Sequence, residues 1–280
     1  EQAITHAAQT VNSDAIWCVA GESVAIQPAV TIPLTYQAGR NVLLVGNDDA
    51  AMAATLSAII ASLAHHASGH QLPFVCRMIQ GARPTDRHAR ELPRMWAAAQ
   101  MAPQVVEPRD AEKLIDQVYE ELLRREERDA SPADEPLQVL LVAQLGRVKA
   151  LRRPDDYDFG DLGDGPLSPA KKLEKILAAG PSHGMFTLLW ADTYGTVQRW
   201  LSRSTLKELE IRILGQMGAA DASNLVESLV GTQLGPHEML LYDEALAQQQ
   251  RFRPYDIASM TQLGRWIQAA ARASGPMAST

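Results

Sequence analysis

A short apolar strand, a glycine-containing loop and an Ala-rich helix follow one another over residues 41–66, an order that binds phosphate groups in many nucleotide-binding proteins. The loop residues are Gly46, Asn47, Asp48 and Asp49. In a working phosphate loop the helix opens with Gly, Lys and Ser or Thr, which let the backbone approach the phosphates, neutralise their charge and hold Mg²⁺. Those three positions here carry Ala51, Met52 and Ala53. We therefore expect either a phosphate loop that has lost its chemistry or a plain turn between a strand and a helix.

The two carboxylates of this loop strengthen that expectation. Asp48 and Asp49 would face a triphosphate with charges of the same sign, and like charges within about 4–6 Å repel by kcal/mol amounts in a partly buried site. An exposed helix N-terminus attracts an anion by only about 0.3–1 kcal/mol, which does not replace the missing lysine. The sequence therefore predicts millimolar or weaker affinity for ATP.

The segment Leu137–Val142 is a second buried strand, and the residues that follow it decide whether hydrolysis is feasible. In phosphate-loop enzymes this strand ends in acidic residues that hold Mg²⁺ and polarise water. Ala143 and Gln144 stand there instead and offer no carboxylate. Both halves of the phosphate chemistry are missing together, so we predict no ATP hydrolysis and no cofactor for this chain itself.

Apolar runs alternate with amphipathic stretches along most of the chain, which predicts an α/β domain. The predicted strands are 41–45, 74–79, 137–142, 185–191, 209–214, 238–242 and 251–254, and the predicted helices are 50–66, 87–100, 110–128, 170–179, 196–204, 221–229 and 259–272. A period of two over Ser23–Tyr36 predicts a β-hairpin that is broken near Pro28 and Pro33. We expect a small β element at 1–40, a core at 41–272 and a disordered tail at 273–280.

Three downstream segments carry a family resemblance. An apolar strand from Gly184 ends at Asp192, a later strand contains Arg212, and residues 235–255 have the pattern of a closing hairpin. In order and spacing these segments resemble the sensor strand, the Arg-containing strand and the closing hairpin of FtsK/SpoIIIE/HerA-type DNA-pump motors, over about residues 20–256. The resemblance extends to the ATPase modules of type VII secretion motors, some of which are degenerate.

The resemblance implies a RecA-like P-loop NTPase sheet flanked by helices and preceded by the small β element. It places Asp192 at the sensor position, which is usually Gln, and Arg212 near the nucleotide or a neighbouring subunit. Arg212 also has a purely structural interpretation, as a strand-edge residue paired with Glu210 or Asp221.

The resemblance and the two degenerate motifs together imply a catalytically degenerate module that is a structural or regulatory part of a larger ATP-driven translocase. Two alternatives stay open: a module that holds a protein or peptide in the unused nucleotide cleft, and an ATP-binding DNA translocase domain with unusual motifs. ATP and Mg²⁺ would belong to the parent protein if a sister module is intact. The expected partners are a sister module or further copies of the chain, with duplex DNA bound only through the assembled protein.

The overall charge argues against a general nucleic-acid-binding surface. The chain has 26 Lys and Arg against 33 Asp and Glu, a formal charge of −7, whereas nonspecific affinity for nucleic acid comes from basic side chains that displace counterions. The one basic stretch includes Arg83, Arg87, Arg90 and Arg94. It is either a local DNA-binding patch or a solvated or inter-domain helix face.

Cysteine content and hydropathy indicate a cytoplasmic location. The two cysteines form no disulfide framework, and no uninterrupted apolar run approaches the ~20 residues of a membrane helix. The chain begins at Glu1 without a signal-like segment, so we expect it to be excised from a longer protein and to lie at the cytoplasmic face of a membrane if that protein carries an anchor.

Two further clusters favour structural roles over metal binding. The first is formed by His65, His66 and His70 near a predicted helix end, where imidazoles interact favourably with the helix dipole. The second is an Asp-rich loop within 152–169, whose spacing does not match a calcium-binding EF-hand. We predict no metal site at either cluster.

Overall fold

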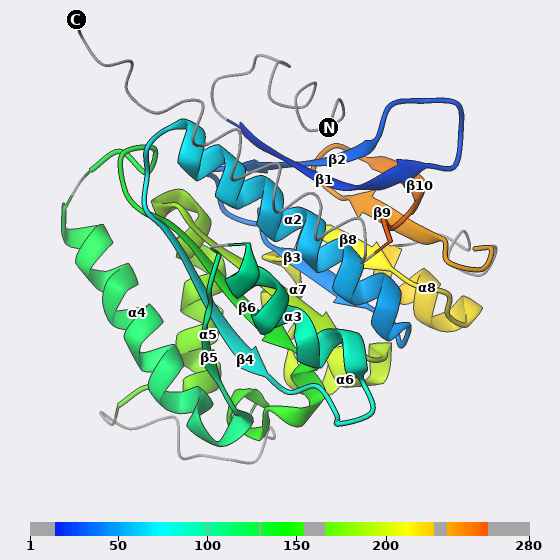
Figure 1. Ribbon diagram of the computed structural model, residues 1–280. Helices are drawn as coiled ribbons and strands as arrows, with labels where there is room; N and C mark the ends of the chain where they lie inside the picture. The colour runs from blue at the N-terminus through cyan, green and yellow to red at the C-terminus, as the bar shows by residue number, and fades with distance from the viewer. Residues whose placement is uncertain (1–14, 100, 129, 154–165, 227–233, 257–280) are drawn as a thin grey trace, which may run out of the picture.

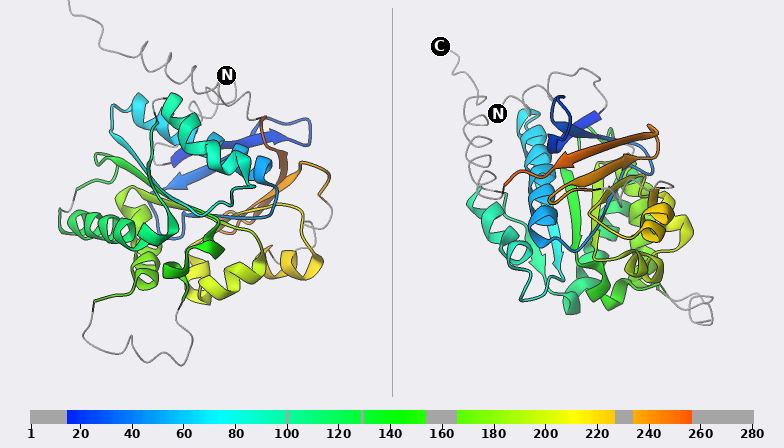
Figure 2. Two further views of the ribbon diagram at one scale, coloured as in Figure 1. Left: turned by 60° about the horizontal axis from the view of Figure 1, so that its bottom comes forward. Right: turned by 90° about the vertical axis from the view of Figure 1, so that its right-hand side faces the viewer.

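The computed structural model describes residues 15–99, 101–128, 130–153, 166–226 and 234–256. The described chain forms a ten-stranded sheet in the order β2-β1-β10-β9-β8-β3-β7-β6-β4-β5, with helices on both faces (Figures 1 and 2). The strands from β8 to β5 in this order run parallel, whereas β9, β10, β1 and β2 pair antiparallel. The predicted α/β class, with a sheet between helices, is confirmed.

The strands are β1 (Ala15–Ser23), β2 (Val30–Thr35), β3 (Val42–Val45), β4 (Phe74–Gln80), β5 (Gln104–Val106), β6 (Leu137–Ala143), β7 (Met185–Ala191), β8 (Ile211–Leu214), β9 (Met239–Asp243) and β10 (Gln248–Arg253). The helices are α2 (Asp49–Gly69), α3 (Arg87–Ala98), α4 (Ala111–Arg128), α5 (Pro169–Ala179), α6 (Tyr194–Trp200), α7 (Arg203–Lys207) and α8 (Ala219–Val226). Short 3₁₀ turns lie at 108–110, 145–147, 149–151 and 180–183. Most predicted elements therefore exist, within a few residues of their expected bounds.

Two apolar cores lie on opposite faces of the sheet. One is formed by α2, α3 and the β1–β2 hairpin, and the other by α4, α5, α6 and α8 (Figure 2). Helix α2 is long and apolar enough to span a membrane, contrary to the expectation from apolar runs, but 83% of the qualifying window is buried inside the protein. We therefore assign α2 to the core of the domain.

The N-terminal hairpin differs from its prediction. The strands are β1 and β2, so Val24 lies in the connecting segment and Ile26 is fully exposed there. The period-two pattern is confirmed in β2, where Val30, Ile32 and Leu34 are buried and alternate with partly exposed residues, but the first strand lies before the predicted segment, because most of β1 is buried and its apolar residues do not alternate with exposed ones. Pro33 does not break the hairpin but lies within β2, which is an edge strand of the described sheet and can accommodate a proline.

Other differences are local. The predicted helix 196–204 is two helices, because the Ser202 side chain accepts a hydrogen bond from Thr205 N (3.0 Å) and starts α7 anew. Strand β5 has only three residues and was not predicted. The predicted helix 259–272, the tail 273–280 and most of the Asp-rich loop lie outside the described residues.

The β1–β2 hairpin is joined to the sheet, since β1 pairs with β10 through Glu22 and Ser23. A buried ion pair adds to this connection: Arg40 donates to both carboxylate oxygens of Asp243 (2.9 and 2.7 Å) and to the carbonyl oxygen of Pro33 (2.5 Å). The division of the chain at residue 40 stays a prediction.

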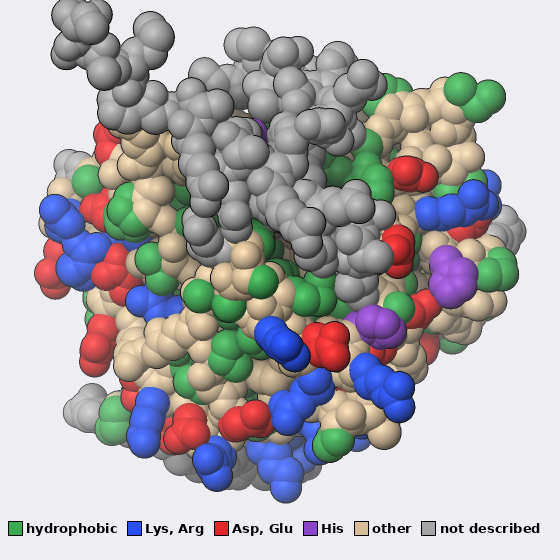
Figure 3. Space-filling model, in the orientation of Figure 1, with side chains coloured by type: hydrophobic (Ala, Val, Ile, Leu, Met, Phe, Trp, Pro, Cys, Tyr) green, Lys and Arg blue, Asp and Glu red, His purple; other side chains and the backbone are tan. Residues whose placement is uncertain are grey.

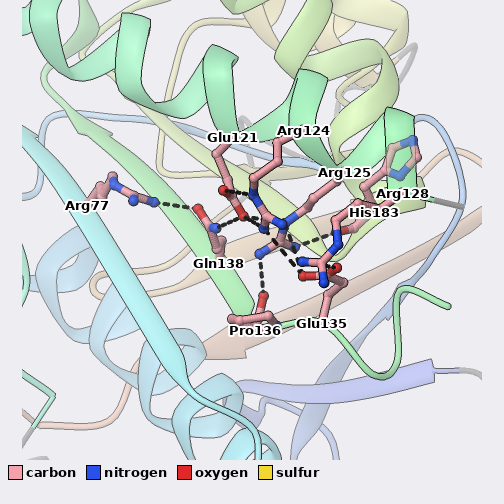
Figure 4. Close-up of polar contacts among 9 residues, drawn as sticks. All are labelled: Arg77, Glu121, Arg124, Arg125, Arg128, Glu135, Pro136, Gln138 and His183. Carbon is pink, nitrogen blue, oxygen red and sulfur yellow. Dashed lines mark hydrogen bonds and ion pairs between the residues drawn. The ribbon is translucent and has the colours of Figure 1, made fainter. Parts of the chain in front are cut away.

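A second polar cluster ties the C-terminal end of α4 to the sheet (Figure 4). Arg125, whose side chain is only 1% exposed, donates to Glu121 Oε1 (2.8 Å) and to the carbonyl oxygens of His183 (2.6 Å) and Pro136 (2.8 Å). Hydrogen bonds from Arg124 and then from Arg125 lower the pKa of Glu121 to about 2, against the effect of burial. The cluster therefore holds α4 against the starts of β6 and β7.

Candidate nucleotide-binding edge

The carboxyl ends of the parallel strands form one edge of the sheet, which is where ligands bind in α/β proteins. Gly46 follows β3, Ala143 and Gln144 close β6, and Asp192 follows β7. The structure therefore brings together at this edge the residues that the sequence assigned to the phosphate loop, the second motif and the sensor position.

Met52 fills the space beside Gly46. Its side chain is completely buried, and a Cβ added to Gly46 would collide with Met52 Cε. The backbone of Gly46 is also engaged, because its N–H donates to Ala191 O (3.0 Å) and its carbonyl oxygen accepts from Trp190 Nε1 (3.0 Å). The position that the sequence analysis assigned to a phosphate-loop lysine thus holds an apolar side chain that packs into the core.

Asp48 is the N-cap of α2. Its backbone is extended, and its Oδ1 accepts a hydrogen bond from Ala51 N (3.0 Å). Its Oδ2 lies 3.6 Å from His237 Nδ1, on the segment before β9. An N-cap carboxylate satisfies amide groups that a phosphate would otherwise contact.

Asp49 binds the next helix rather than its own. Its Oδ2 accepts from His88 N (2.8 Å) and its Oδ1 accepts from Ala89 N (3.1 Å), both in the first turn of α3. Asp86, which precedes α3, makes no capping bond to it and instead accepts from Arg83 N (2.7 Å). From the sequence, Asp49 was interpreted only as a charge that repels phosphate. Its role as a cap of the N-terminus of α3 was not predicted.

At the end of β6 the chain packs backbone against backbone. The carbonyl oxygen of Ala143 accepts from Gly81 N (2.9 Å), and a Cβ on Gly81 would lie 2.5 Å from that oxygen. Gln144 is buried in a left-handed conformation (φ 60°). The polar side chain that sequence reasoning missed here is Gln80, whose amide donates to Ala89 O (2.8 Å) and accepts from Ala82 N (3.1 Å).

Asp192, which was predicted at the sensor position, has its carboxylate held at the start of α6. Asp192 Oδ1 accepts from Thr196 Oγ1 (2.5 Å), and its Oδ2 lies 3.9 Å from Arg83 Nη2. Arg83 was predicted as part of a basic patch, and no signal in the sequence linked it to Asp192. This contact joins the loop after β4 to the loop after β7 across the edge.

Arg212 is buried, and its guanidinium is bonded within the chain. It donates to the carbonyl oxygens of Leu209 (3.1 Å) and Leu225 (2.5 Å), and its Nη2 lies 2.5 Å from Glu244 Oε2. Its ion-pair partner is thus Glu244 rather than Glu210 or Asp221. The predicted contact of Arg212 with a neighbouring subunit stays a prediction.

The remaining predicted arginines lie on or near α3. Arg87, Arg90 and Arg94 belong to that helix, and Arg90 lies 3.3 Å from Glu107. On the lower part of the face shown in Figure 3, Lys and Arg side chains alternate with Asp and Glu. The local charge is therefore mixed, and a role of this stretch in DNA binding stays a prediction.

The histidine cluster lies at the C-terminal end of α2. The rings of His66 and His70 are 4.3 Å apart, and burial, followed by the charges of His70 and His65, lowers the pKa of His66 to about 4. Within the described ranges no group of three His, Cys, Asp or Glu side chains is arranged to hold a metal ion.

Comparison with known proteins finds similarity in structure only. The chain's sequence matches no protein-family model and no curated protein. The structure of the pCW3 conjugation coupling protein TcpA, in its monomer form with ATPγS, is similar over 92% of this chain, with 12% identity and a TM-score of 0.66. The cytoplasmic domain of the Thermomonospora curvata type VII secretion ATPase EccC is similar over 90% of this chain, with 15% identity and a TM-score of 0.62.

The chain therefore shares the overall fold of these two proteins. A structure of ATPases 2 and 3 of the same EccC, in complex with a signal sequence peptide, matches over 96% of this chain, with 12% identity and a TM-score of 0.63. The chain spans 71% of the TcpA structure, 49% of that two-ATPase structure and 31% of the EccC cytoplasmic domain. This module is thus comparable to a part of the larger secretion ATPases.

Proposed function

We propose that this chain is a catalytically inactive FtsK/HerA-type module that serves as a structural or regulatory part of a larger ATP-driven translocase. The observation that carries the proposal is at the phosphate-loop position. There Met52 fills the place of the lysine, and the carboxylates of Asp48 and Asp49 bind the first turns of α2 and α3. Chain groups thus satisfy amides at two helix N-termini that would otherwise attract phosphate.

The absence of metal-binding carboxylates at the end of β6 supports the same proposal. A triphosphate reaches an enzyme as its Mg²⁺ complex, and in phosphate-loop enzymes an acidic residue after this strand holds the metal. Here Ala143 and Gln144 occupy that position, and their carbonyl oxygens closely approach Gly81. ATP and Mg²⁺ would be bound by a sister module of the parent protein.

The proposed partner is that sister module or another copy of the chain. Support comes from the neighbours, since EccC has several ATPase modules in one protein and this chain matches only part of its length. A peptide partner is a second candidate, because a signal sequence peptide is bound in one of those EccC structures. Duplex DNA would be bound only by the assembled protein, in the cytoplasm.

A phosphate-release assay on the purified chain tests the proposal. We expect no turnover above the buffer background, with or without Mg²⁺. Met52→Lys alone should not create activity, because it restores a charge but no carboxylate at the end of β6. Turnover by the unmodified chain that is abolished by Arg212→Ala would contradict the proposal.

A further inference from the structure

A small cavity lies between the sheet and the helices α4 and α5, remote from the nucleotide-binding edge. Its lining includes Arg77 of β4, Gln138 of β6 and Thr187 of β7, with Val118 of α4 and Ile176 of α5 above them. Arg77 and Thr187 both pair with Leu140, on opposite sides of β6. The two polar side chains therefore project from the same row of the sheet and on the same face.

Two polar atoms at this cavity have no hydrogen-bond partner among the described groups: Thr187 Oγ1 and Arg77 Nε. Thr187 is completely buried, and its N–H is already donated to Asn41 Oδ1 (2.9 Å). The other end of the Arg77 guanidinium donates to Gln138 Oε1 (Figure 4). A buried polar group without a partner costs about 1–3 kcal/mol, so two such groups facing one cavity call for an explanation.

The volume of the cavity limits which molecule can bind in it. The cavity volume is about 10 Å³, which is close to the minimum that holds one water molecule and too small for an organic ligand. We propose that one structural water molecule binds here, accepting a hydrogen bond from Arg77 Nε and sharing one with the hydroxyl of Thr187. Buried waters of this kind are part of a fold and satisfy polar groups that the chain leaves unpaired.

The water extends a polar chain that is already present. Gln138 accepts from Arg77 and donates through Nε2 to Glu121 Oε1 (2.9 Å), which is bonded to Arg125 (Figure 4). With the water in place, hydrogen bonds run without interruption from β7 to α4 by way of β4 and β6. The water thus couples Thr187 to the cluster that anchors α4.

The isosteric substitution Thr187→Val tests the proposal by the sign of its effect. If water is bound, the valine removes one of its partners, and the folding equilibrium constant from urea titration should fall roughly five- to tenfold. If the cavity is dry, Thr187→Val removes an unsatisfied buried hydroxyl and should raise that constant. Thr187→Ser, which keeps the hydroxyl, should preserve the water.

Thr35→Val is the matched control. Thr35 Oγ1 is also buried without a partner among the described groups, but Thr35 does not line this cavity. We expect Thr35→Val to leave the folding constant unchanged or to raise it. Electron density for one water in a high-resolution crystal structure, lost in Thr187→Val, completes the test. An empty cavity in that map, or a stabilised Thr187→Val, would overturn the proposal.

Discussion

The contact between Gly46 and Met52 can be tested by a double-mutant cycle. A Cβ on Gly46 would collide with Met52 Cε, and the next nearest atoms are Gly215 Cα and N at 3.3 and 3.4 Å. The φ angle of Gly46 is not positive, so its backbone conformation is compatible with alanine. The cost of Gly46→Ala therefore comes from displacing the side chain of Met52, which is fully buried.

The magnitudes follow from packing. Overpacking by Gly46→Ala should lower the free energy of unfolding by about 1–3 kcal/mol. Met52→Ala leaves a cavity and should lower it by about 2–5 kcal/mol. In the double variant the new methyl group enters the space left by Met52, so we expect the combined loss to be smaller than the sum by roughly 1–2 kcal/mol.

Urea titration followed by circular dichroism gives these free energies for the wild type and the three variants. Gly69→Ala is the control, since a Cβ at this end of α2 meets no atom within 4 Å and should change stability by less than about 1 kcal/mol. Losses that add within about 0.5 kcal/mol would refute the claim that Met52 lies over Gly46.

Three further predictions concern other parts of the molecule. Arg125→Met should lower the free energy of unfolding by about 2–4 kcal/mol, because it removes the hydrogen bonds to two part-buried carbonyl oxygens. Arg124→Met, at a side chain 41% exposed, should cost less than about 1 kcal/mol in the same urea titration. Because the pKa of Glu121 is lowered from its unfolded value of 4.5 to about 2, its ionised carboxylate stabilises the fold at pH values above 4.5, by about 1–2 kcal/mol after solvent screening. This contribution should be lost as the pH falls from 4.5 to about 2. Glu121→Gln should flatten that part of the profile of stability against pH, and an unchanged profile would contradict the assignment. The isolated chain, with a charge of −7, should bind duplex DNA weakly and with a shallow salt dependence in anisotropy titrations, and nanomolar binding at physiological salt would contradict this.

The sequence was sufficient for the fold because the central strands are buried on both faces. Segments such as Leu137–Ala143 and Met185–Ala191 are nearly continuous apolar runs, and their bounds were predicted to within one residue. The first strand of the hairpin was not predicted, since β1 packs partly against α2 and its apolar residues do not alternate with exposed ones, whereas the alternation in β2 was predicted. Pairing between β1 and β10 joins residues from the two ends of the described chain, and no local pattern signals it.

The candidate site was predicted by position but not by contact. Gly46, Gln144 and Asp192 lie at one edge, as parallel strands require, because the carboxyl ends of such strands meet there. The capping of α3 by Asp49 and the approach of Arg83 to Asp192 depend on how separate loops pack. Such contacts are fixed by tertiary structure, which the spacing of residues along one chain does not specify.

The most direct test of the account is a calorimetric titration of the purified chain with ATP in the presence of Mg²⁺. We expect a dissociation constant in the millimolar range or weaker, because Met52 adds no charge and Asp48 and Asp49 already bind the helix N-termini. Binding of MgATP in the micromolar range would contradict it.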